Sequence, residues 1–131
     1  MKAETPVTNH IVKLVKTQLP TVRLIYLFGS YVNQQENAES DIDIAFLADK
    51  KLLPIKRWEI QQQLADQLNK DIDLIDLLSA STVMQNEIIH KGICLFAQDN
   101  EQGKFEMQVM SMYQNLNEKR ADILHDFMGN A

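Results

Sequence analysis

Two aspartates, Asp41 and Asp43, lie one residue apart at the start of an apolar run and are the residues of this chain best suited to chemistry. Side chains alternate across a β-strand, so both carboxylates point to one face, about 7 Å apart along the chain. Two like charges this close resist ionising together unless a cation lies between them. Mg²⁺ prefers carboxylate oxygens and uses few protein ligands together with the phosphates of a substrate. The pair therefore predicts a magnesium site.

A Gly29-Ser30 turn follows the apolar run 24–28 and precedes the first aspartate by ten residues. Glycine lets a backbone approach phosphate closely, and N–H groups at the start of a helix bind anions. We therefore expect Gly29 and Ser30 to bind the phosphates of a nucleotide, while Asp41 and Asp43 bind the metal.

Three further acids interrupt the apolar run 71–77: Asp71, Asp73 and Asp76. Buried carboxylates are costly unless they are paired or bound to metal, so this density of acids needs a reason. Asp73 has apolar neighbours on both sides, and if its strand lies beside that of Asp41 and Asp43, the three carboxylates form one cluster. Asp71 is expected in solvent at the strand entrance, and Asp76, on the other face, in a turn or at a helix cap.

Composition narrows the classes of function. The chain has 131 residues, 45% of them hydrophobic, which suits one domain with a single core. Its net charge is −5 and its lysines and arginines do not cluster, so a long nucleic-acid substrate is not expected. The single cysteine, Cys94, excludes an internal disulfide and fits a reducing cytoplasm. No signal peptide and no membrane-spanning run is recognisable.

Periodicity and punctuation residues predict an α/β (α+β) protein with the order α-β-β-α-β-α-β-α, a small mixed sheet backed by helices. The helices are expected over residues 8–19, 54–69, 81–92 and 100–128, and the strands over residues 22–28, 41–48, 72–77 and 93–97. Gly92 is expected as a left-handed cap. The inner face of the second helix is expected to use Ile55, Trp58, Leu64 and Leu68.

The last helix repeats apolar residues at three-four spacing, with a break at Lys119, namely Phe105, Val109, Met112, Leu116, Ile123 and Phe127. Its first half is expected to pack on the sheet of the same chain. For the second half two readings stay open, packing or binding to a partner, because an apolar helix face can dock in a groove. The organisation predicted is thus a domain over residues 1–99 and a C-terminal helix over 100–131.

The chain resembles the minimal nucleotidyltransferases of the DNA polymerase β-like superfamily. The resemblance rests on residues 27–30 (LFGS), 40–44 (SDIDI) and 71–77 (DIDLIDL), with 88–93 (IIHKGI) similar to the usual end of the domain. It implies that Gly29 and Ser30 bind the nucleotide, and that Asp41, Asp43 and Asp73 are the catalytic acids that hold two Mg²⁺ ions.

One position departs from the family pattern. Residues 31–34 (YVNQ) are uncharged where many members carry a basic residue, so this loop is not expected to supply an arginine to the triphosphate. Lys56 or Arg57 could replace it, or could belong to a solvated helix face.

Minimal nucleotidyltransferases of this size are similar to the antitoxins of toxin–antitoxin pairs. The resemblance implies that ATP is the substrate and that AMP is transferred to a tyrosine of a cognate all-helical HEPN toxin, which is silenced in the cytoplasm. Two alternatives stay open. The chain could neutralise the toxin by binding and occlusion alone, although three acids on one face favour an enzyme. It could also modify a small molecule, although such enzymes usually carry a larger second domain.

Overall fold

The computed structural model describes residues 6–29 and 41–129. Their elements follow the order expected from the sequence: α1 (Pro6–Gln18), β1 (Leu24–Phe28), β2 (Ile42–Leu47), α2 (Pro54–Leu68), β3 (Ile72–Asp76), α3 (Thr82–Lys91), β4 (Ile93–Ala97) and α4 (Glu101–Gly129). Each predicted helix and strand is confirmed, with ends that shift by about two residues, as is usual for such boundaries.

The four strands form one sheet in the order β3-β2-β1-β4. β1 is antiparallel to both β2 and β4, whereas β2 and β3 are parallel, so the sheet is mixed as predicted. This polarity brings the end of β1 and the starts of β2, β3 and β4 to one edge of the sheet, which we call the carboxylate edge.

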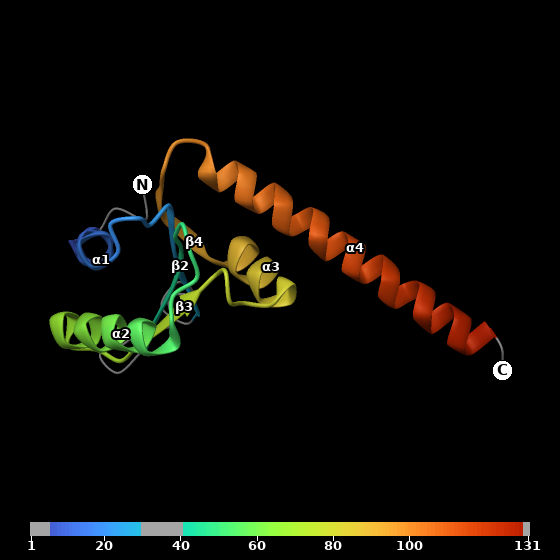
Figure 1. Ribbon diagram of the computed structural model, residues 1–131, viewed down its shortest axis with the longest axis horizontal. Helices are drawn as coiled ribbons and strands as arrows, with labels where there is room; N and C mark the ends of the chain where they lie inside the picture. Colours follow the sequence, from blue (N-terminus) through green and yellow to red (C-terminus); the bar gives the residue numbers. More distant parts are fainter. Residues whose placement is uncertain (1–5, 30–40, 130–131) are drawn as a thin grey trace.

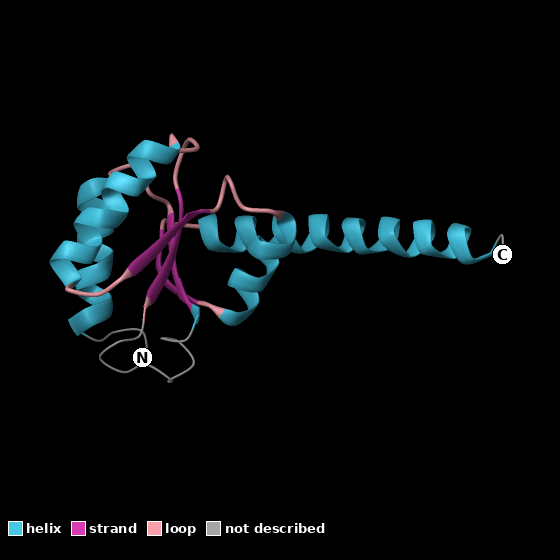
Figure 2. Cartoon of the chain, turned by 90° about the horizontal axis from the view of Figure 1, so that it is seen from below, coloured by secondary structure: helices cyan, strands magenta, loops and turns pink. Residues whose placement is uncertain are grey.

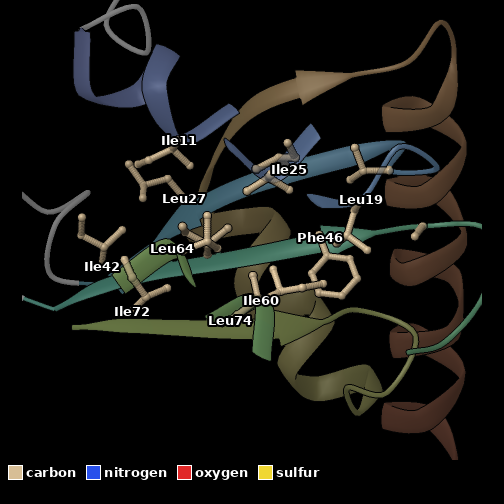
Figure 3. Close-up of a cluster of buried hydrophobic side chains, with 14 residues drawn as sticks. Ile11, Leu19, Ile25, Leu27, Ile42, Phe46, Ile60, Leu64, Ile72 and Leu74 are labelled. Carbon is tan, nitrogen blue, oxygen red and sulfur yellow. The ribbon is translucent and has the colours of Figure 1, made fainter. Parts of the chain in front are cut away.

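Helices cover both faces of the sheet, α1 and α2 on one side and α3 with the first half of α4 on the other (Figures 1 and 2). Under α1 and α2, one cluster of apolar side chains includes Ile11, Ile25, Leu27, Phe46 and Leu64 (Figure 3). The opposite face uses the alternate strand residues, among them Tyr26, Ala45 and Leu47, against Phe105 and Val109 of α4. Each fully buried large side chain stabilises this arrangement by about 1.5–3 kcal/mol.

The outer edge of β3 is closed by two side chains of α2. The Leu74 amide donates to Oε1 of Gln61 at 3.0 Å, and Nη1 of Arg57 donates to the Leu74 carbonyl at 3.0 Å. Arg57 therefore takes the place of a neighbouring strand, rather than lying on a solvated face. An edge strand otherwise leaves such groups unpaired. This pair fixes β3 at the residue that follows Asp73.

Two details of the sequence prediction are wrong. Ile55 and Trp58 are exposed. α2 instead turns Ile60 and Leu64 inward, on the side of the helix that also carries the two residues bound to β3. Gly92 has φ −86°, an extended conformation instead of a left-handed one. Its missing side chain is required by space, since a Cβ there would lie 2.6 Å from the Ile88 carbonyl oxygen.

The first turns of α4 are fixed to the sheet and to the residue before it. Arg23, which precedes β1, pairs with Asp49 at 2.9 Å and with Glu101 at 3.1 Å. The buried hydroxyl of Tyr26 donates to Glu106 at 2.7 Å, and burial together with this carboxylate raises the pKa of the Tyr26 phenol far above its usual range. Along the described chain, no helix has the length and apolar content that crossing a bilayer requires.

The closure of the β3 edge can be tested with Gln61→Ala. Removing the acceptor leaves the Leu74 amide without its partner, so we expect the free energy of unfolding to fall by about 1 kcal/mol and the Leu74 amide to exchange faster with solvent. Gln62→Ala makes the same change at the exposed neighbouring position and should leave both measurements unaltered. Equal exchange rates in the two variants would contradict the role assigned to Gln61.

Candidate active site

The carboxylate edge brings together four of the five residues predicted to act. Asp43 is paired with Asp73 across the parallel strands β2 and β3, and on its other side with Phe28, the residue before Gly29. Asp41 lies just before β2, exposed to solvent. The predicted neighbourhood of the strands that carry Asp43 and Asp73 is therefore confirmed. Ser30 lies outside the described residues, as do the uncharged positions 31–34.

Gly29 is packed directly against Asp43. It has φ +83°, a left-handed backbone conformation that residues with a side chain rarely adopt. A Cβ on Gly29 would also collide with the Asp43 carboxylate, whose Cγ would lie 3.0 Å away. The sequence predicted glycine here for the approach of phosphate. The described contact gives an additional reason, because only a residue without a side chain leaves room for this carboxylate.

Like charges dominate the electrostatics of the edge. The pKa of Asp43 is raised, first by its partial burial and then by repulsion from Asp73 and Asp41. No basic side chain is among the causes of the shift at Asp43. The edge therefore brings carboxylates together that repel one another.

Carboxylate oxygens are the donors that a hard divalent cation prefers, so the chemistry of Asp41, Asp43 and Asp73 fits Mg²⁺. Among the described residues, however, no three His, Cys, Asp or Glu side chains are already placed as a ready metal cluster. Metal binding by these three residues therefore stays a prediction.

The remaining acids of β3 serve the fold. Asp71 is exposed at the strand entrance, as expected. Asp76 is buried on the opposite face, where its two oxygens accept from the amides of Leu52 and Leu78 at 2.8 and 3.0 Å. The expectation of a turn acid is confirmed for Asp76, and its bond to Leu52 additionally ties the loop before α2 to the end of β3.

Cys94 and the three histidines stay outside the site. The Cys94 thiol is half-buried, and burial raises its pKa to about 11, which suits an inert side chain. His10, His90 and His125 are exposed and lie on three different helices.

Sequence reasoning missed the part played by Gly92. This glycine lets the end of α3 approach β1, with the Leu27 carbonyl oxygen 3.1 Å and the Phe28 Cβ 3.3 Å from where its own Cβ would be. α3 is thereby held beside the carboxylate edge. The available signal was a glycine at the end of a predicted helix, which also fits a left-handed cap.

Comparisons with known proteins agree with this geometry. The family model described as polymerase beta nucleotidyltransferase matches residues 9–101. The protein adenylyltransferase MntA of Shewanella oneidensis is 43% identical over 122 residues, which cover 93% of this chain and 88% of that protein.

Solved structures agree over the same length. A crystal structure of a toxin–antitoxin with AMP-PNP has a TM-score of 0.82 and 43% identity, covering 92% of this chain and 97% of the matched one. A structure of a tri-AMPylated Shewanella oneidensis HEPN toxin in complex with MNT antitoxin has a TM-score of 0.76 and 42% identity, covering 92% of this chain and 94% of the matched one.

The packing of Gly29 can be tested with Gly29→Ala. The added methyl group is strained at φ +83° and displaces the Asp43 carboxylate, so we expect the free energy of unfolding to fall by about 1–3 kcal/mol. Gly103→Ala is the matched control, because nothing lies within 4 Å of its Cβ position in α4, and helix propensity should stabilise it by about 0.5–1 kcal/mol. Urea unfolding of both variants gives the comparison, and equal stabilities would contradict the packing.

The repulsion at Asp43 predicts a dependence of stability on pH. Because the pKa of Asp43 is higher in the folded chain than in the unfolded chain, the folded state holds this proton more tightly. Without divalent metal, this tighter proton binding stabilises the fold at pH values below the ordinary aspartate pKa. That stabilisation should be lost as the pH rises from the ordinary aspartate pKa through the raised pKa of folded Asp43. Asp43→Asn should lack this loss and be more stable than the wild type at pH 7. Urea unfolding in EDTA across a pH series measures the stability of both proteins. The same pH dependence in the wild type and in Asp43→Asn would contradict the raised pKa of Asp43.

Proposed function

The chain belongs to the polymerase beta nucleotidyltransferase family, and we propose that it is an antitoxin that transfers AMP from ATP to a tyrosine hydroxyl of a cognate HEPN-type toxin. The observation that carries the proposal is the pairing of Asp43 with Asp73 at one sheet edge, with Gly29 packed beneath Asp43. Its support is the identity of 43% with a protein adenylyltransferase along nearly the whole chain. Similar chains have been solved with AMP-PNP and with an AMPylated HEPN toxin.

Asp41, Asp43 and Asp73 are the residues that would hold magnesium. Two bound Mg²⁺ ions would supply charge neutralisation at the triphosphate and lower the pKa of the attacking hydroxyl. Such cations would also relieve the repulsion that raises the pKa of Asp43. Gly29 and Ser30 would hold the phosphates through backbone N–H groups and the Ser30 hydroxyl.

The reaction balances as a displacement at the α-phosphorus of ATP. The bond from the tyrosine oxygen to phosphorus forms, the bond from phosphorus to the pyrophosphate oxygen breaks, and pyrophosphate leaves. Asp73, which is exposed beside Asp43, would accept the proton that the tyrosine hydroxyl releases. We assign this reaction to the cytoplasm, where ATP is abundant and the lone Cys94 stays reduced.

The decisive measurement is the intact mass of the purified cognate toxin after incubation with this chain, ATP and Mg²⁺. We expect the toxin to gain the mass of one or more AMP groups. Asp43→Asn and Asp73→Asn should each lower the rate at least about 100-fold, because several kcal/mol of charge stabilisation is lost. Both variants should stay folded by circular dichroism, and wild-type rates in either would refute the assignment.

Occlusion without chemistry remains the second candidate function, and the same variants separate it from transfer. If neutralisation depends on AMP, Asp43→Asn should bind the toxin and yet fail to suppress its toxicity in cells. If occlusion is enough, that variant should protect as well as the wild type. The three carboxylates expected on one face favour the first outcome, because occlusion has no use for them.

A further inference from the structure

We propose that the distal half of α4, residues 116–129, forms with α3 the surface on which the acceptor toxin docks. This inference rests on the proposed function, since it identifies where that protein substrate is held. The distal half extends away from the sheet and beyond the other described elements (Figures 1 and 2).

The apolar stripe of α4 continues past the end of the domain. Phe105 and Val109 are 8% and 2% exposed, where the helix packs on the sheet. Ile123 and Phe127 follow them by 18 residues, about five turns, and therefore lie on the same side of the helix. Their exposed fractions are 66% and 78%, and Met112 is already 48% exposed, so the stripe is buried only as far as Val109 and is uncovered in the distal half.

Charges on the distal half are sorted by face. Lys119 and Arg120 lie three and four residues after Leu116 and four and three residues before Ile123, so both border the apolar side. Glu118, Asp122 and Asp126 follow one another at intervals of four and form a separate acidic line. The surface available to a partner is therefore apolar with two positive charges. It fits an apolar helical face of the toxin that presents carboxylates to Lys119 and Arg120.

A groove of about 580 Å³ lies between α3 and α4. Its lining includes Asn86 and His90 of α3 and Asn117 of α4, and on α4 it continues toward Leu124, which is 62% exposed and follows Asn117 by seven residues. The side-chain oxygen of Asn86 is buried and has no hydrogen-bond partner among the described residues. His90 lies near the end of α3, where Gly92 packs against β1 just before Gly29, so a protein seated at this end of the groove would lie toward the carboxylate edge.

A second exposed apolar patch does not meet this requirement. Leu53, Ile55 and Trp58 are exposed around the start of α2. That helix follows the end of β2, at the sheet edge opposite the carboxylates. A toxin bound there would be held away from Asp73, so the distal half of α4 is the better match to a protein substrate.

The test uses the full chain and the purified cognate toxin. Ile123→Glu/Phe127→Glu places two charges on the stripe, and we expect the Kd for the toxin, measured by calorimetry, to rise at least tenfold. AMP transfer should slow at low toxin concentration and recover at saturating toxin, so KM rises while kcat and ATP binding are unchanged. Met107→Glu is the matched control, because Met107 is as exposed as these side chains but lies on the outward side of the first half.

The outcomes separate this inference from the proposed function. If the wild type adds no AMP, the proposed function fails, while the Kd comparison still decides the docking surface. Asp43→Asn should retain the wild-type Kd. An unchanged Kd in the double variant overturns the inference, as does a loss of binding in Trp58→Glu alone. If the double variant leaves the Kd for the toxin unchanged and only lowers the molar mass that light scattering gives for the chain without toxin, a second copy of the chain occupies the stripe. That result likewise overturns the inference.

Discussion

The repulsion around Asp43 is the constraint on which the carboxylate edge depends. A partly buried carboxylate lies beside Asp73 and near Asp41, and its pKa is raised first by burial and then by repulsion from both. A cation bound there would relieve this repulsion. A site that is unfavourable when empty and favourable with a cation couples stability to metal and nucleotide binding. Asp43 therefore weakens the unliganded fold for the same reason that it suits a metal.

Holding two strands in parallel at this point requires support from outside the sheet. Among the strands of the described residues, β3 is at the edge of the sheet and has β2 as its one neighbour. Arg57 and Gln61 bind its free side at Leu74, one residue after Asp73, while Asp76 ties its far end to the loop before α2. Asp73 is thereby fixed by contacts on both sides of its strand, although it makes none of them itself. Precision at a site often depends on such supporting residues.

The features of the carboxylate edge that depend on local sequence pattern could be predicted from the sequence. Alternation in residues 41–47 and 71–77 was enough to place Asp43 and Asp73 on one face, and the spacing from Gly29 was enough to place the turn beside them. The inner face of α2 was predicted wrongly because Ile55 and Trp58 are apolar, yet the helix is oriented by the polar demands of the β3 edge. The conformation of Gly92 was missed because the reason for glycine there is the approach of α3 to β1, which no local pattern records. The contact of Gly29 with Asp43 is of the same kind.

α4 shows most clearly how burial can differ along one helix. Its apolar positions run from Phe105 to Phe127 with a break at Lys119, and sequence alone could not decide where packing stops. Packing stops where the sheet beneath the helix ends. Arg23 and Tyr26 fix the first turns of α4, and the distal half begins beyond the sheet. A helix that is anchored at one end keeps its direction, and its uncovered stripe then has a defined position relative to Asp73. Chemistry and recognition can thus be separated in one small chain, with the carboxylates on the sheet edge and the exposed stripe on the extended helix.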